Sequence, residues 1–308
     1  LLLSQMNLEP SYLRDNALSI LEQAKNLYLD LFKGKPHMGE FEAKRVAVVG
    51  DTHGAFFEVT KFVLESLIKE VDLVVFLGDY VDRQPPYGLE NLIAVLQAFV
   101  ETKGERVIPL RGNHESPITN HYYGFYDEVA EKLGADKYDA FRDFFAHMPL
   151  TAVVNGWFAV HGGLPGVQKD DKMELGIRSP QEVNELVRIP DENPDNPIAM
   201  QLLWNDPREM REYDFIPSLR GDGIYYFGER PTEEFLEKGN LRGILRGHET
   251  ANAVRVLMGG KVINVFSSVY HGEAAGVLIM EGSEPKEVFV ITPGLDVMKL
   301  PYGQIQGY

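Results

Sequence analysis

Apolar residues recur at helical spacing near the start of the chain, and further on they gather in short runs that alternate with more helical patterns. The first pattern predicts an amphipathic helix that stops at Gly34, with Pro36 just beyond; it consists of Leu13, Ala17, Ile20, Leu21, Ala24, Leu27 and Leu31. Two β-rich runs, RVAVV at 45–49 and DLVVFL at 72–77, each precede apolar residues at helical spacing, over 59–67 and 89–100. Strands and helices that alternate in this way are typical of α/β proteins.

The second half of the chain has more predicted strands and fewer helices between them. These strands are WFAV, GILR, KVINVF, AGVLIM and EVFVI. We therefore expect an α/β fold with a central β-sandwich of mixed sheets, flanked by helices.

The segment RIPDENPDNP, at 188–197, predicts an ordered surface loop. Motifs on both sides of this loop point to one site, so we expect a single domain over 1–308, with 1–43 as an N-terminal helical extension packed on it.

The composition narrows the classes of function. Among 308 residues, 30 Lys and Arg stand against 46 Asp and Glu, which gives a net charge of −16 and argues against binding nucleic acid or an anionic membrane. The chain has no cysteine, so any metal must be held by His, Asp, Glu or Asn. The start, LLLSQMNLEP, does not resemble a signal peptide, and no apolar run approaches membrane-spanning length. A soluble, cytoplasmic protein is the expectation.

Five apolar runs end in polar side chains beside a glycine, which lets the backbone turn sharply. VAVVGDTHG supplies Asp51 and His53, VVFLGDYVDR supplies Asp79, Asp82 and Arg83, VIPLRGNHE supplies Asn113 and His114, FAVHGG supplies His161, and GILRGHE supplies His248. Ligands of α/β sheets gather at the carboxyl ends of the strands. We expect these loops to converge, with a dimetal site at the strand ends.

The donor types predict two metal ions. The candidate ligands are Asp51, His53, Asp79, Asn113, His161 and His248, which offer oxygen and nitrogen but no sulfur. Six protein donors are too many for one catalytic metal with an open position, but they suit two divalent cations that share a carboxylate, for which Asp79 is the natural bridge. Mn is the preferred cofactor, with Fe and Zn as alternatives. Such a pair generates hydroxide and neutralises phosphate oxygens, so the reaction is hydrolysis of a phosphate ester.

Three further residues fit supporting roles. His114 follows the ligand Asn113 and would stand near the metals as the general acid. Asp82 would fix its tautomer, and Arg83 would bind phosphate oxygens in a bidentate manner. A single GD or HGG fragment is more often a turn than a ligand, and only the succession of five indicates function. Residues outside this succession are predicted to be surface or packing residues: His37, His121, His147, Asp72, Asp127 and Glu128.

The motifs GDTHG, GDYVDR, LRGNHE, HGG and RGHE, in this order, resemble the signature of the phosphoprotein phosphatase family within the metallophosphoesterases. The segments YYGFYDE and LLWNDP are similar to those of type-1 and type-2A serine/threonine protein phosphatases. The resemblance covers roughly 44–280. It implies a metallophosphoesterase-like β-sandwich and a phosphatase that uses a metal-bridging hydroxide for in-line attack.

Carried over to this chain, the resemblance assigns each site residue. It implies that Asp51 and His53 bind the first metal, that Asp79 bridges, and that the second metal is held by Asn113, His161 and His248. It also implies His114 as the acid supported by Asp82, and a phosphate and substrate site formed by Arg83, Asn113, Arg220, Tyr123 and Tyr270.

Some positions depart from the family pattern. Gln84 stands where glycine is usual, RGHE stands where RAHQ is common, and His271 takes the place of a cysteine. None of these changes removes a proposed ligand. The changes concern the binding of inhibitors and regulatory subunits. The sequence does not identify such partners.

Two rival functions remain. A nucleotide or diadenosine polyphosphate hydrolase would use the same dimetal chemistry on another substrate, whereas a non-catalytic phosphoprotein-binding module would need only part of it. The complete set of ligands and acid argues against the binding module, and GNHE followed by GFYDE favours phosphoprotein or phosphopeptide substrates.

Overall fold

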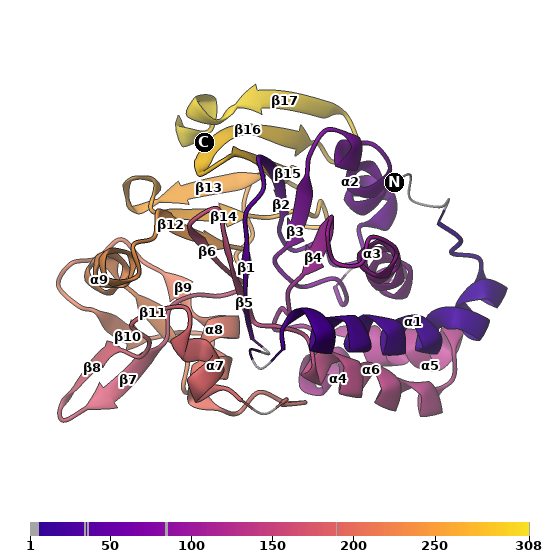
Figure 1. Ribbon diagram of the computed structural model, residues 1–308, viewed down its shortest axis with the longest axis horizontal. Helices are drawn as coiled ribbons and strands as arrows, with labels where there is room; N and C mark the ends of the chain where they lie inside the picture. The colour runs from indigo at the N-terminus through magenta and orange to yellow at the C-terminus, as the bar shows by residue number, and fades with distance from the viewer. Residues whose placement is uncertain (1–5, 34, 36, 84–85, 189, 308) are drawn as a thin grey trace.

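The computed structural model describes residues 6–33, 35, 37–83, 86–188 and 190–307. Two six-stranded mixed sheets form its centre, with helices on their outer sides (Figure 1). The first sheet has the order β1 (Met38–Phe41), β5 (Thr151–Val154), β6 (Trp157–Val160), β12 (Gly243–Arg246), β14 (Val262–Val265), β13 (Val254–Leu257). The second has the order β17 (Val297–Pro301), β16 (Glu284–Ile291), β15 (Ala275–Glu281), β2 (Arg45–Val49), β3 (Leu73–Phe76), β4 (Val107–Pro109). The predicted layered α/β fold is confirmed.

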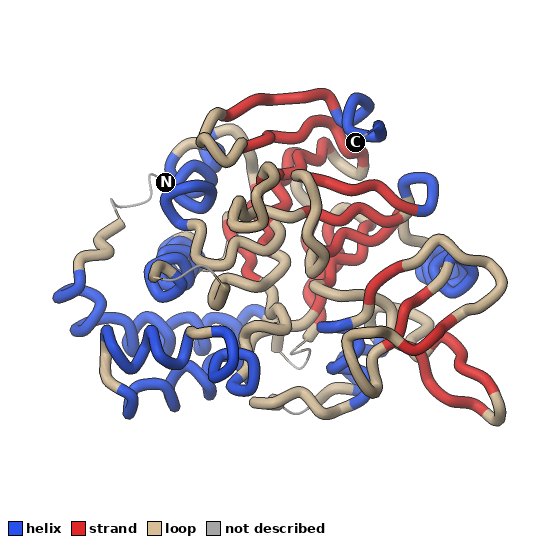
Figure 2. Tube along the Cα trace, turned by 180° about the vertical axis from the view of Figure 1, so that it is seen from behind, coloured by secondary structure: helices blue, strands red, loops and turns tan. Residues whose placement is uncertain are grey.

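The helices form two groups, one beside each sheet (Figures 1 and 2). Beside the second sheet lie α1 (Pro10–Leu31), α2 (Lys61–Glu65), α3 (Gly88–Glu101), α4 (Pro117–Tyr123), α5 (Phe125–Lys132) and α6 (Tyr138–Ala146). Beside the first lie α7 (Glu182–Leu186), α8 (Pro197–Trp204) and α9 (Glu229–Gly239). In the described part of the chain, no helix is both long and apolar enough to span a bilayer.

Alternation along the strands divides the core into two layers, because successive side chains of a strand point to opposite faces. Trp157 and Ala159 of β6 pack in the larger apolar cluster with β2 and β15, whereas Phe158 and Val160 pack in the smaller one with α8 and α9. The first sheet is therefore buried on both faces at β6. This explains why that strand reads as a continuous apolar run.

Several elements differ from the predicted pattern. The helix expected over 59–67 consists of three short pieces, because Ala55 accepts main-chain hydrogen bonds from both Val59 and Thr60 and forms a wide π-turn at Phe56–Thr60 before α2. The stretch 1–43 holds the strand β1 besides α1, and β1 pairs in parallel with β5. Two small sheets complete the fold: β7 (Gly166–Lys169) with β8 (Lys172–Leu175), and β10 (Phe215–Pro217) with β11 (Tyr225–Phe227) and β9 (Asp206–Pro207).

The two large sheets meet where their parallel strands end. In the second sheet β2, β3 and β4 run parallel, and in the first β6, β12 and β14 do. Asp51, just after β2, forms a parallel bridge with Phe266, just after β14, and its carbonyl accepts a hydrogen bond from Ser267 N at 3.0 Å. The loops that follow both sets of strands therefore lie along one seam.

Candidate active site

The six predicted ligand residues come together at the seam between the sheets. The loops after β2, β3 and β4 carry Asp51, His53, Asp79 and Asn113, and those after β6 and β12 carry His161 and His248. Donor atoms of Asp79, His161 and His248 all lie within 4.8 Å of one another, and so do those of His53, Asp79 and His114.

Asp79 lies between the two halves of the cluster. Its Oδ2 is 3.4 Å from His53 Nε2 and 3.1 Å from His161 Nε2. On the far side, His53 Nε2 is 3.5 Å from Asp51 Oδ2. Two ligand atoms at right angles on one metal, each about 2.1 Å from it, lie about 3 Å apart. The observed spacing is close to this value on both sides of Asp79, as a bridging carboxylate requires.

Each imidazole uses one nitrogen for a main-chain carbonyl and turns the other to the cluster. Nδ1 of His53 is 2.8 Å from Val81 O, and Nδ1 of His161 is 2.8 Å from Leu77 O. His248 is reversed: its Nε2 is 3.0 Å from Trp204 O. A carbonyl only accepts hydrogen bonds, so the anchored nitrogen carries the proton and the other offers a lone pair.

The carboxylates are also aimed by the backbone. His248 N donates to Asp51 Oδ1 and His114 N donates to Asp79 Oδ1, both at 2.9 Å, which leaves each Oδ2 facing the imidazoles. Asn113 Oδ1 is 2.9 Å from His161 Nε2. With its amide turned over, the Asn113 nitrogen would donate to His161 Nε2 at 2.9 Å and to His248 Nδ1 at 3.2 Å. The donor set fits divalent metal ions.

Close packing at the seam requires glycine at two positions. A Cβ at Gly112 would lie 2.1 Å from Asp79 Oδ1, and one at Gly247 would lie 2.4 Å from Asp51 Oδ1. Left-handed backbone also concentrates here, at His53 (φ 45°), Asp79 (64°), Asp82 (68°), Arg83 (68°) and His248 (74°). Such strain persists only where the surroundings hold it, and it is common at functional sites.

Burial and charge act together on the ionisable groups of the cluster. Burial alone would lower the pKa of His161, but the carboxylates of Asp79 and Asp51 outweigh it and raise that pKa to about 9. Burial alone would raise the pKa of Asp51, but the imidazoles of His161 and His53 hold it lower, at about 2. The carboxylates that keep a proton on His161 would equally stabilise a metal cation in its place.

His114 and Asp82 form a buried pair beside the cluster. His114 Nδ1 is 2.7 Å from Asp82 Oδ2, while Asp82 Oδ1 accepts from Phe125 N at 2.8 Å. Burial raises the pKa of Asp82 to about 7, and burial with the positive charges of His53 and Arg83 lowers the pKa of His114. Both shifts favour a pair that shares one proton and has no net charge. Nε2 of His114 is left for a substrate.

The predicted substrate residues surround the cluster. The guanidinium of Arg83 lies over the Tyr123 ring, 4.5 Å from its centroid, and that ring is 5.1 Å from the His114 ring. Tyr270 meets His53 edge-on at 5.6 Å. Arg220 Nε donates to Asp206 at 2.6 Å, and its other end reaches His248 O at 3.4 Å. Gln84, which departs from the family pattern, lies outside the described residues.

Several residues that shape the site received no role from the sequence. The carboxylate of Glu115 is fully buried and accepts hydrogen bonds from the main-chain N–H groups of Asp79, Tyr80 and Gly112, at 2.7, 3.1 and 2.8 Å. Its place in the motif RGNHES was the only available signal. Asn120 donates to Asp82 at 3.0 Å, and no spacing rule indicates it.

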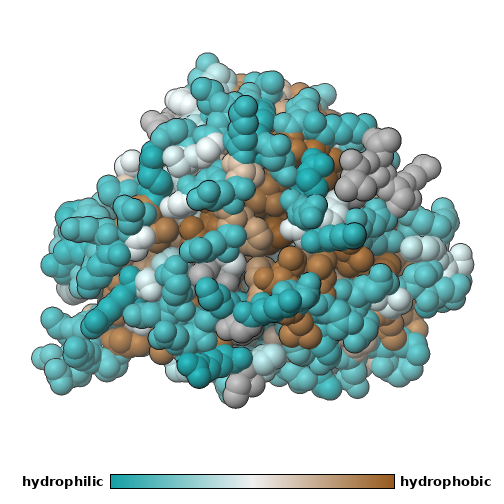
Figure 3. Space-filling model, in the orientation of Figure 1, coloured by the Kyte–Doolittle hydropathy of each residue, from teal (hydrophilic) through white to brown (hydrophobic). Residues whose placement is uncertain are grey.

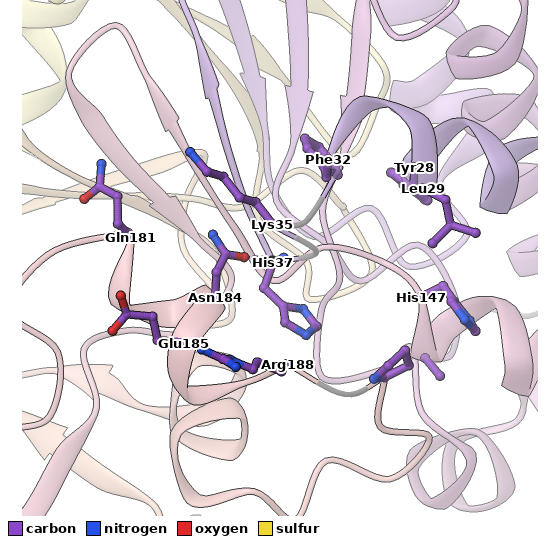
Figure 4. Close-up of a pocket in the computed structure, with 12 residues that line it drawn as sticks. Tyr28, Leu29, Phe32, Lys35, His37, His147, Gln181, Asn184, Glu185 and Arg188 are labelled. Carbon is purple, nitrogen blue, oxygen red and sulfur yellow. Dashed lines mark hydrogen bonds between the residues drawn. The ribbon is translucent and has the colours of Figure 1, made fainter.

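A cavity of about 650 Å³ lies between α1, α6 and α7, and it contains none of the predicted site residues (Figure 4). Tyr28, Phe32, His37, Asn184 and Arg188 are among the residues that line it. The His37 side chain is buried, in line with its predicted packing role. This cavity is separate from the metal-ligand cluster.

Comparisons with known proteins agree with this geometry. The family model for calcineurin-like phosphoesterases matches residues 44–251. A probable serine/threonine-protein phosphatase of Encephalitozoon cuniculi is 33% identical over 304 residues, which make up 95% of this chain and 62% of that protein. Serine/threonine-protein phosphatase 5 of Homo sapiens is 34% identical over 258 residues, or 80% of this chain and 48% of the relative. The solved structure of a protein serine/threonine phosphatase from Saccharomyces cerevisiae has a TM-score of 0.73 at 26% identity, and the match covers 96% of this chain and 90% of that one.

The fold and the paired ligand clusters define a metallophosphoesterase. The chain belongs to the calcineurin-like phosphoesterase family, and its serine/threonine phosphatase relatives confirm the resemblance to the phosphoprotein phosphatases. It spans 62% and 48% of the lengths of the two curated relatives described.

Proposed function

We propose that the protein is a metal-dependent serine/threonine phosphatase that hydrolyses phosphomonoesters on proteins. The observation that carries this proposal is the position of Asp79 Oδ2 between the imidazoles of His53 and His161, with the His114–Asp82 pair beside them. The serine/threonine specificity rests on the relatives, whose names give that activity.

The residues would hold two divalent cations, one on Asp51 and His53 and one on Asn113, His161 and His248, with Asp79 shared. When bound, the cations would activate water and neutralise phosphate charge. Mn is the proposed metal, and Fe and Zn suit the same donors. We also propose a cytoplasmic location, as expected from the sequence analysis.

The chain's own residues would bind phosphate and supply a proton. Arg83 and Arg220 would hold the phosphate oxygens, between the rings of Tyr123 and Tyr270. As the oxygen of water bonds to phosphorus, the bond to the seryl oxygen breaks with its electron pair, and that oxygen takes the proton from His114 Nε2. The proton lost by water balances the one given up by His114.

The test is His114→Asn. Loss of a general acid lowers turnover about 10²–10⁴-fold, so this variant should keep its bound metal but lose most turnover of a phosphoserine peptide. Metal content is measured by elemental analysis and turnover by phosphate release. His121→Asn, seven residues along and exposed, is the matched control and should retain activity. Full activity of His114→Asn would remove the acid from its assigned role, and faster turnover of diadenosine polyphosphates by the wild type would favour the nucleotide hydrolase.

A further inference from the structure

A chain of buried hydrogen bonds continues behind the His114–Asp82 pair. Asn120, on α4, is fully buried. Its Nδ2 donates to Asp82 Oδ2 at 3.0 Å and to the main-chain oxygen of His114 at 2.6 Å. Its Oδ1 accepts a hydrogen bond from the Tyr138 hydroxyl at 2.6 Å. Asp82, the backbone of His114 and the Tyr138 hydroxyl therefore meet at one buried amide.

The contacts of Asn120 allow one orientation of its amide. Both protons of Nδ2 are used, one on a carboxylate and one on a carbonyl, and neither partner could donate to an amide oxygen turned their way. The side chain thus ties the backbone of His114 to the carboxylate that holds the His114 ring. Phe125 N fixes the other oxygen of Asp82, so the carboxylate is held at both ends.

Tyr138, the first residue of α6, completes the chain. It is 3% exposed, and its ring lies against those of Tyr126 and His121, at 5.1 and 5.7 Å between centroids. The hydroxyl donates to the amide oxygen, and this polarises the amide and strengthens the two hydrogen bonds that Nδ2 donates.

We propose that Asn120 and Tyr138 are positioning residues that orient the His114 imidazole toward the leaving oxygen of the substrate. This inference rests on the proposed function of His114 as the acid. Neither residue reaches the phosphate. They act through Asp82, by fixing which ring nitrogen faces the carboxylate and where the other one points.

This role predicts a dependence on the leaving group. A seryl alkoxide is a poor leaving group and needs the proton from His114, whereas a 4-nitrophenolate leaves readily without one. A misdirected imidazole should therefore slow hydrolysis of a phosphoserine peptide far more than that of 4-nitrophenyl phosphate. General loss of structure would slow both alike.

The experiment compares kcat and KM of the metal-loaded wild type, Asn120→Ala and Tyr138→Phe on both substrates. Loss of such a supporting partner costs about 10–100-fold, so kcat of Asn120→Ala on the phosphoserine peptide should fall by this factor with little change in KM. On 4-nitrophenyl phosphate the fall should stay below about twofold. Tyr138→Phe should show the same pattern with a smaller factor, and the two changes together should cost less than their product because they act in series.

Tyr28→Phe is the matched control. Tyr28 is also a buried tyrosine, and its hydroxyl donates to Pro109 O at 2.7 Å instead of to Asn120. This variant should keep the wild-type ratio of the two rates. Equal losses on both substrates in folded Asn120→Ala and Tyr138→Phe, or no loss on either, would overturn the proposal.

A measurement without turnover separates this inference from the proposed function. In the Zn²⁺-loaded protein, which is diamagnetic, the proton on His114 Nδ1 should give a downfield NMR resonance that is absent in His114→Asn, and it should broaden or move upfield in Asn120→Ala. An unchanged resonance would count against positioning even if the enzyme is active. If the wild type releases phosphate from neither substrate but the resonance still changes in Asn120→Ala, the proposed function fails, while the effect of Asn120 on the His114 ring stands.

Discussion

At the scale of single residues, burial of ionisable side chains has consequences outside the site as well as within it. His37 lines the cavity beside α1, and burial, together with the charge of Arg111, lowers its pKa from 6.5 to about 4. Lys35, Glu185 and Arg188 line the same cavity. In the unfolded chain His37 takes up a proton as the pH falls below 6.5, while the folded protein resists it until about pH 4.

The free energy of unfolding should therefore fall as the pH drops from 6.5 toward 4. The unfolded state binds more protons in this range, and the full effect of His37 is about 3 kcal/mol. In His37→Leu, the contribution of His37 to the fall in the free energy of unfolding with pH should vanish. Urea unfolding of the metal-free wild type and variant at pH 7 and pH 5 would measure it. A slope that is the same in both proteins would contradict the assignment.

The sequence predicts residues of the site better than it predicts their contacts. Asp51, Asp79 and His161 each follow an apolar run in their own segment, so local pattern was enough to find them. His248 presents Nδ1 to the cluster because its Nε2 is anchored on the carbonyl of Trp204, which is 44 positions away in the sequence. Asp82 accepts a hydrogen bond from Asn120, which lies on a helix 38 positions later. Such contacts are set by packing between elements, which no local pattern encodes.

At the scale of elements, α1 shows how the N-terminal segment is attached. Its buried face packs against α3 and α6, and Tyr28 donates a hydrogen bond to Pro109 of β4, the strand that leads to Asn113. Helical spacing over three turns or more predicted this helix and α3 well. The short strands β7 to β11 lack a clear alternation and were missed.

The single-domain organisation stays a prediction that α1 can test. Leu21 is 2% exposed and belongs to the large core cluster, while Leu18, on the same helix, is 36% exposed. Leu21→Ala should lower the free energy of unfolding of the whole protein by about 2–5 kcal/mol, whereas Leu18→Ala should change it by less than about 0.5 kcal/mol. Urea unfolding followed by circular dichroism measures both. An early, separate transition in Leu21→Ala would indicate that the helix unfolds on its own.

At the scale of the whole molecule, the candidate ligands come from both sheets. Asp51, Asp79 and Asn113 stand at the ends of strands of the second sheet, and His161 and His248 at the ends of strands of the first. Bound cations would thus cross-link the two halves of the fold. They would also relieve the repulsion of a chain whose net charge is −16.

Metal should stabilise the fold through this link. At a Mn²⁺ concentration 100 times Kd, one site adds about 2.7 kcal/mol to the free energy of unfolding, and a chelator should remove this gain. Asp79→Asn should lose most of the gain, whereas Asp72→Asn, a carboxylate outside the cluster, should keep it. Unfolding of the two variants with and without Mn²⁺ tests this expectation. A gain in Asp79→Asn equal to that of the wild type would show that the shared carboxylate does not bind metal.

The reversed ring of His248 has a consequence for how the backbone approaches the centre. Nδ1 is one bond from the ring carbon attached to Cβ and Nε2 is two bonds away, so a ligand that uses Nδ1 has the shorter reach. The main chain after β12 must come nearer to the centre than the chain after β6, and Gly247, whose missing side chain would strike Asp51, makes that approach possible. The shorter reach of His248 through Nδ1 is thus compensated by the lack of a side chain at the neighbouring Gly247.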